Sequence, residues 1–226
     1  MSMTFDPHTT PATQVSQAQD VIMTNPTVLS ELETYWSTLP RTRGVPHRKD
    51  VDPVAMGSLL EDSIILERVA PGVARIRVAG RNMAKLVGVE PRGLPLTALM
   101  LPEARAAIAN YLEAAFMGPS IVEMPLESPR AVGQPHLSGK MLLLPLRDDH
   151  GRVSRLLGVL VMSGRRGLGG RRFVISAASA PRVEPVLGLH AVAAGTPAAS
   201  PRAAMSKADI KMAEARPALR LVVSNP

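Results

Sequence analysis

The chain has 226 residues, a formal net charge of +7 and no cysteine, which excludes disulfides, thiolate catalysis and cysteine-ligated metal clusters. Hydrophobic residues make up 46% of the sequence and aromatic residues only 3%, so the core must be aliphatic. No apolar run approaches the ~20 residues of a membrane-spanning helix and the N-terminus lacks a signal-peptide pattern, so we expect a cytoplasmic protein.

The N-terminal part is predicted to form a leader followed by a helix. Residues 1–24 are rich in Thr, Gln, Pro and Ser, which is typical of disorder. Within residues 24–40, Pro26 suits a first helical turn, and apolar residues recur at helical spacing. They are Val28, Leu29, Leu32, Tyr35, Trp36 and Leu39. We expect Trp36, the only tryptophan, to anchor the core; stacking against a cofactor is the alternative.

The next segments alternate short helices with strands. Asp52 before Pro53 predicts a capped helix through Leu60. A hairpin is predicted from Ser63–Val69 and Val73–Ala79 around the turn Ala70-Pro71-Gly72. Helical turns are expected at Asn82–Leu86 and Leu96–Met100, and a longer helix from Pro102 to Gly118. Its buried side comprises Ile108, Leu112, Ala115 and Phe116.

Three further strands come next. Segment Ser120–Glu127 alternates, with Val122, Met124 and Leu126 inward, and its prolines are typical of an edge strand. Met141–Leu146 and Leu156–Met162 form a hairpin with a polar loop. Successive strand residues point to opposite faces, yet both faces of this hairpin are apolar. Both faces must therefore be covered, and the first helix is the candidate for the second cover.

The order of these elements predicts an α+β fold with an antiparallel sheet and helices on one face. Five motifs then carry a resemblance: LETYW (residues 32–36), PHRKDVDP (46–53), IILE (64–67), RIRVAG (75–80) and LLLPL (142–146). In this order they resemble a bacterial PAS-domain family long labelled as of unknown function, over roughly residues 27–163. The resemblance implies a five-stranded antiparallel sheet, a cavity roofed by helices, and a cytoplasmic signalling or regulatory role without catalytic residues.

The cofactor is unknown from the sequence. Haem-binding PAS domains use a histidine of the long helix, and Pro102–Met117 contains none; covalent flavin needs a cysteine, which is absent. Both are therefore disfavoured, while non-covalent flavin stays open. The five histidines show no metal-ligand spacing, so we expect no metal site.

Two groups of candidate residues arise from this hypothesis. A ligand cavity would be lined by Met83, Leu86, Val87, Ile108, Leu112, Leu143 and Leu160. A partner face would use Tyr35, Trp36 and Leu142, and the expected partner is a signalling protein or a second copy of the chain. Ordinary core packing is the alternative at most of these positions.

Arginines give a third group. Arg77 and Arg81 have a spacing that suits two guanidinium groups gripping a phosphate, although a solvated strand face explains them equally. The segment Gly164–Arg172, GRRGLGGRR, is predicted to be a flexible hinge, in which Arg165, Arg166, Arg171 and Arg172 are candidate anion contacts. Asp148, in the polar hairpin loop, is expected to be solvated.

Residues 25–163 are thus the predicted domain and 164–226 a basic tail. The tail carries eight Arg and two Lys against three acidic residues, whereas residues 1–163 are neutral. An alternative function is therefore electrostatic attachment of the tail to nucleic acid or an anionic membrane. Most of the tail is expected to be disordered, with a short helix at Ser206–Ala215 and an edge-pairing strand at Leu219–Val223.

Overall fold

The structure is a computed structural model and describes residues 21–23, 25 and 27–186. The predicted helix Ser206–Ala215 and the predicted strand Leu219–Val223 lie outside the described residues, as does most of the predicted leader.

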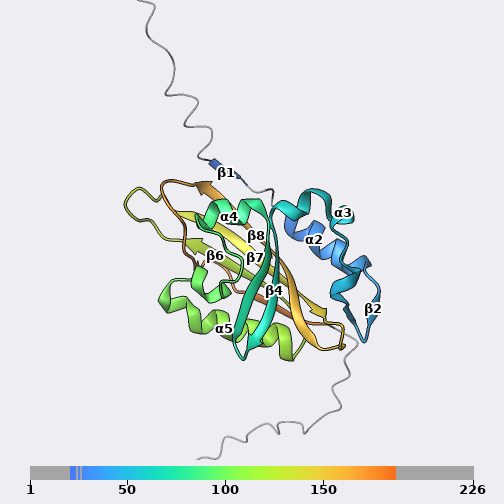
Figure 1. Ribbon diagram of the computed structural model, residues 1–226. Helices are drawn as coiled ribbons and strands as arrows, with labels where there is room; N and C mark the ends of the chain where they lie inside the picture. The colour runs from blue at the N-terminus through green and yellow to red at the C-terminus, as the bar shows by residue number, and fades with distance from the viewer. Residues whose placement is uncertain (1–20, 24, 26, 187–226) are drawn as a thin grey trace, which may run out of the picture. The chain divides into compact units, whose positions relative to one another are not determined.

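The described chain contains ten short or long strands and a smaller set of helices (Figure 1). The strands are β1 (Val21–Met23), β2 (Arg41–Thr42), β3 (Val45–Pro46), β4 (Ser63–Ala70), β5 (Val73–Ala79), β6 (Ser120–Ser128), β7 (Leu137–Arg147), β8 (Val153–Arg165), β9 (Val174–Ile175) and β10 (Arg182–Pro185). The α-helices are α2 (Thr27–Thr38), α3 (Pro53–Met56), α4 (Arg81–Val87) and α5 (Arg105–Met117). Single 3₁₀ turns are η1 (Arg48–Asp50), η2 (Gly57–Glu61), η3 (Leu96–Leu99) and η4 (Pro102–Ala104).

The main sheet is antiparallel, in the order β10-β6-β7-β8-β4-β5, which confirms the predicted α+β class. The five predicted strands form its body, and the short strands β1, β9 and β10 extend it. Local signals behave as expected: Asp52 accepts a hydrogen bond of 2.9 Å from Val54 N–H at the start of α3, and α4 ends before Gly88, whose φ is 74°.

The prediction that Ser120–Glu127 is an edge strand was wrong. On the outer side of β6, β10 pairs with residues 120–123 and β9 pairs with Leu126 and Glu127. Pro125 lies in the gap between the two, where its missing N–H costs no ladder bond. Its carbonyl still accepts a hydrogen bond of 2.9 Å from Ser176 N–H. The outer side of β6 therefore stays paired on both sides of this proline.

The folded region extends further than predicted at both ends. Val21–Met23, within the predicted leader, forms β1 and pairs with β8. Beyond Ser163 the chain turns back onto the fold instead of leaving it. Phe173 is fully buried, its N–H donates to Leu99 O (3.0 Å), and its carbonyl accepts from Leu101 N–H (2.9 Å). The fold of the described residues therefore continues to Val186.

Glycines explain how this returning segment fits. A side chain at Gly170 would collide with the carbonyl of Val87, and one at Gly167 would collide with the carbonyl of Gly133. The glycines of Gly164–Arg172, interpreted from the sequence as a hinge, therefore allow close approach of two backbones.

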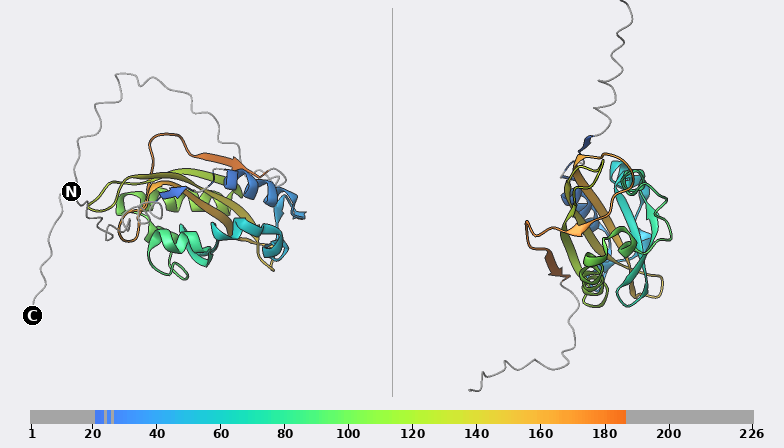
Figure 2. Two further views of the ribbon diagram at one scale, coloured as in Figure 1. Left: turned by 90° about the horizontal axis from the view of Figure 1, so that it is seen from above. Right: turned by 90° about the vertical axis from the view of Figure 1, so that its left-hand side faces the viewer.

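The helices cover the two faces of the sheet and bury two separate apolar clusters (Figures 1 and 2). The α5-side cluster lies among α4, η3, α5 and the sheet; its members include Ile64, Leu66, Met83, Leu86, Val87, Leu99, Met100, Ile108, Leu112, Phe116, Val122, Met124, Leu126, Leu137, Met141, Leu143, Leu160, Met162 and Phe173. The α2-side cluster lies between α2, α3, η2 and the opposite face; its members include Leu32, Trp36, Leu39, Val45, Met56, Leu59, Ile65, Leu142, Leu144, Leu146, Leu157 and Val159.

Strand β7 alternates between these two clusters. Met141 and Leu143 belong to the α5-side cluster, whereas Leu142, Leu144 and Leu146 belong to the α2-side cluster, and all five are fully buried. The prediction that both faces of the hairpin are covered is confirmed. Burial of one such side chain contributes about 1.5–3 kcal/mol, so this strand contributes to both cores at once.

Within the described residues, no helix is long and apolar enough to cross a membrane.

Candidate functional site

The seven predicted cavity residues all lie in the α5-side cluster. Helix α4 contributes three of them from one face, because positions three and four apart on a helix share a side. Helix α5 and strands β7 and β8 contribute the rest. Their side chains are between 0% and 5% exposed. The structure therefore brings together, in one buried apolar cluster, the residues that the sequence pointed to: Met83, Leu86, Val87, Ile108, Leu112, Leu143 and Leu160.

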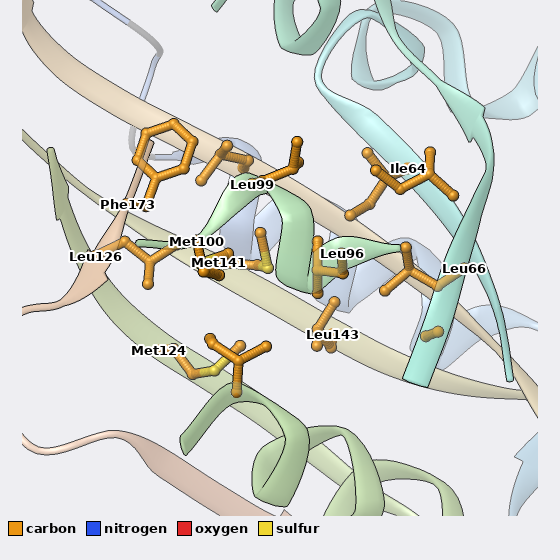
Figure 3. Close-up of a cluster of buried hydrophobic side chains, with 14 of the residues drawn as sticks. Ile64, Leu66, Leu96, Leu99, Met100, Met124, Leu126, Met141, Leu143 and Phe173 are labelled. Atoms are coloured by element: carbon orange, nitrogen blue, oxygen red, sulfur yellow. The ribbon is translucent and has the colours of Figure 1, made fainter. Parts of the chain in front are cut away.

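Methionine is prominent in this cluster. Five members are methionines: Met83, Met100, Met124, Met141 and Met162. Figure 3 shows Met100, Met124 and Met141 among the leucines, with Phe173 beside Leu99 and Leu126 at one end of the cluster and Ile64 with Leu66 at the other. Methionine side chains are unbranched and repack easily, so they adapt to irregular neighbours.

One charged side chain is buried beside this cluster. Arg171 is fully buried, and its backbone N–H donates to Leu86 O at the end of α4 (3.0 Å). Its guanidinium donates from Nη2 to the carbonyl of Pro135, while Nε and Nη1 have no partner among the described residues. Burial lowers the pKa of Arg171, because desolvation disfavours the charged form.

The sequence placed Arg171 in a surface group of anion contacts, and the structure separates that group. Arg165 is exposed, and Arg166 and Arg172 are half-buried. Arg172 Nη1 donates to the carbonyl of Arg171 (3.2 Å). The glycines permit the close approach of two backbones that buries Arg171, but the sequence alone does not say which backbone they approach.

Arg77 and Arg81 do not converge on one site. Arg77 pairs with Glu67 on the neighbouring strand, and Arg81 Nη2 lies 2.5 Å from Glu61 Oε1. Each guanidinium thus has a different carboxylate partner, and Glu67 also contacts Arg155 at 2.6 Å. Nearby, Val78, Ala79, Glu90 and Arg92 line a pocket of about 520 Å³, whose charges have both signs.

The predicted partner face lies under α2. Trp36 is 2% exposed and Leu142 fully buried, both in the α2-side cluster. The prediction of Trp36 as a core anchor is confirmed, and its indole nitrogen also donates to Pro145 O. Tyr35 is half-buried, and its hydroxyl accepts from Asp52 N–H (2.8 Å). Trp36 and Leu142 are therefore packed in the interior, between α2 and the sheet.

Asp148 is more than a solvated loop residue. It accepts hydrogen bonds from the N–H groups of His150 and Arg152, each 2.9 Å, and from the Ser154 hydroxyl at 2.8 Å. Burial raises the pKa of Asp148, but these hydrogen bonds outweigh it and lower the pKa to about 2. Its role is to order the β7–β8 loop.

No group of three or more His, Asp or Glu side chains arranged to hold a metal ion occurs in the described part of the chain.

Comparison with known proteins gives one family match. The family model described as "PAS domain" matches residues 23–161. The solved structures that are similar include the light state of the blue-light photoreceptor Aureochrome1 LOV, with 19% identity and a TM-score of 0.36 over 50% of this chain and 90% of that chain. Another is an RNA-binding light-oxygen-voltage receptor, with 20% identity and a TM-score of 0.37 over 54% of this chain and 37% of that chain. No curated protein matches.

Proposed function

The chain belongs to the PAS domain family, and from this premise we propose that it is a sensory or regulatory binding module, acting through ligand- or partner-dependent protein–protein contacts. The proposal assigns it no catalytic step. The expected partner is a signalling protein or a second copy of the chain, and the expected ligand site is the α5-side cluster.

The observation that carries this proposal is the position of β7 between two clusters. Leu143 packs in the α5-side cluster and Leu142, its neighbour in the chain, packs beneath α2. Tightly packed interiors transmit small displacements because they contain few voids. A ligand that rearranges the α5-side cluster would therefore change the support of α2, which lies at the outer surface where a partner can bind.

Native mass spectrometry of the full chain, purified from its own cells and compared with a denatured sample, tests this function. A bound small mass that is lost on denaturation supports a ligand-dependent module. A defined dimer or a stoichiometric complex supports a partner-dependent one. Recovery of only the bare monomer from native samples would contradict both forms of the proposal.

The alternative, electrostatic attachment through the basic tail, has less support. Arg171 is buried, Arg182 contacts Glu33 at 2.6 Å, and the segment that contains them packs on the fold. Arg171 is therefore enclosed by the fold and Arg182 is paired with Glu33, so neither charge of the tail is presented to the phosphates of a nucleic acid or a membrane surface.

A further inference from the structure

Arg171 has hydrogen-bonding capacity that the chain does not use. Four buried side-chain nitrogen or oxygen atoms in the described residues lack a partner, and two of them, Nε and Nη1, are on this guanidinium. Arginine stays charged in proteins and offers five N–H donors in a planar fork. Buried donors are nearly always satisfied, so two orphaned nitrogens on one buried cation indicate a missing acceptor.

The chain does not supply the countercharge either. None of the ion pairs formed among the described residues includes Arg171, and its acceptor, the carbonyl of Pro135, is neutral. Arg182, a half-buried arginine whose buried Nε also lacks a partner, differs in this respect, because it contacts Glu33, Glu123 and Glu184. A buried charge without a partner is costly, so Arg171 calls for an anion and not only for a water molecule.

The charge and the planar shape of the Arg171 guanidinium indicate which kind of anion it would bind. Arg171 is fully buried, and the remote groups that it contacts by hydrogen bonds, Leu86 O and Pro135 O, are neutral backbone carbonyls. A monoanion neutralises one guanidinium, whereas a phosphate dianion would leave a net negative charge in an enclosed space. A carboxylate is planar and accepts two parallel N–H bonds from the guanidinium fork.

The position of Arg171 also connects it to the cluster proposed to bind a ligand. Its N–H bonds Leu86 O on α4, and Phe173, two residues later, is buried at one end of the cluster (Figure 3). We propose that Arg171 binds the carboxylate of a small organic acid, whose remaining atoms lie against the α5-side cluster. This inference rests on the proposed function, since it names the ligand class of that binding module.

Thermal unfolding of the full chain tests the site. The probes are the sodium salts of formate, acetate, butyrate and hexanoate, compared with sodium chloride and sodium phosphate at equal ionic strength and pH. At least one carboxylate should raise Tm beyond chloride, and the shift should grow with the logarithm of its concentration above Kd, because a ligand of the folded state at free concentration L stabilises it by RT ln(1 + L/Kd). The alkyl chain length of the carboxylate that gives the largest Tm shift indicates the size of the apolar part of the ligand.

Two variants locate the effect. Arg171→Met removes the guanidinium and should abolish the carboxylate response, whereas the matched Arg165→Met, at an exposed position of the same segment, should keep it. Equal carboxylate shifts in the wild type and Arg171→Met would overturn the proposal. So would a larger response to phosphate than to every carboxylate.

A crystal structure of the wild-type chain, grown with the most effective carboxylate, covers the case in which Arg171→Met does not fold. A carboxylate within hydrogen-bond distance of Nε or Nη1 confirms the site, and a water molecule alone there overturns it. A ligand or partner in the native mass spectra, with no carboxylate response, would reject the anion site and leave the proposed function standing. Bare monomer in those spectra together with no carboxylate response would reject both.

Discussion

The indole nitrogen of Trp36 donates a hydrogen bond of 3.0 Å to the carbonyl oxygen of Pro145, 109 residues further along the chain. The pairing of β6 with β7 ends at Val122 and Leu143, two residues before Pro145, and the indole of α2 supplies a donor there. Helix α2 is thus attached to the central hairpin by a buried polar contact in addition to its apolar face.

Trp36→Phe tests that attachment. A smaller aromatic ring remains, and the buried carbonyl of Pro145 loses its donor; loss of the hydrogen bond alone should lower the free energy of unfolding, measured in urea, by about 1–3 kcal/mol. Ser37→Ala, on the exposed side of the same helix, is the control and should change stability by less than about 0.5 kcal/mol. Equal stabilities of the wild type and Trp36→Phe would show that the hydrogen bond contributes nothing.

Leu142→Ala and Leu143→Ala should destabilise the chain to a similar degree, but they should disturb the apolar clusters on opposite faces of the sheet. Both residues are fully buried, so each truncation should cost about 2–5 kcal/mol. Trp36, the only tryptophan, lies in the same cluster as Leu142. Its emission should shift to the red in native Leu142→Ala and stay unchanged in native Leu143→Ala. The same spectral shift in both variants would show that the two clusters are not separate.

Arg182 and Glu33 join β10 to α2 through an ion pair of 2.6 Å. The hydrogen bond to Glu33 raises the pKa of Arg182 despite partial burial. Because both side chains are partly exposed, a double-mutant cycle with Arg182→Met and Glu33→Gln should give a coupling of about 0.2–1 kcal/mol that decreases in high salt. The cycle between Arg182 and Glu184, where the contact is 3.4 Å, should give a smaller value. A coupling to Glu33 that is zero at low salt would refute the link.

Asp148 should make the hairpin sensitive to acid. Its pKa in the folded chain is about 2, below the ordinary 3.8, so the carboxylate stabilises the fold above about pH 4 and loses this effect as the pH falls toward 2. Asp148→Asn removes the charge and should be less stable than the wild type at pH 6. The difference in free energy of unfolding should shrink between pH 4 and pH 2; a constant difference across this range would contradict the assignment.

Two truncations test the extent of the fold. Removal of residues 164–226 deletes Phe173, which is fully buried, together with both strands that pair with the outer side of β6. This should cost at least about 3 kcal/mol, as loss of a buried phenylalanine does. Removal of residues 187–226 deletes five basic and two acidic residues and should leave Tm within a few degrees. Equal stabilities of the two truncated chains would show that residues 164–186 do not contribute to the fold and that the folded domain ends at Ser163.

Features that depend on local pattern could be predicted from the sequence. The alternation of Leu142 and Leu143 between faces is a consequence of strand geometry alone, and the buried side of α5 is a consequence of helical spacing. The burial of the seven predicted cavity residues follows from the same patterns, whereas their role in lining a ligand cavity stays a prediction. The burial of Arg171 could not be predicted, because it depends on contacts of the returning segment with Leu86 and Pro135, both remote in the sequence. Composition favoured a hinge there, and only the fold reveals what the glycines approach.

The two-sided packing of β7 also limits how this region can change in length. Deletion of one residue before Met141 would turn every later side chain of the strand to the opposite face. Leu142 would then occupy the position of Met141, and the packing of both clusters would be disrupted by this one deletion. An insertion of two residues preserves the alternation of the strand. Insertions or deletions of any other length can be accommodated in the β7–β8 loop, which Asp148 orders. Related chains should therefore differ in length at that loop and hardly ever by one residue within β7.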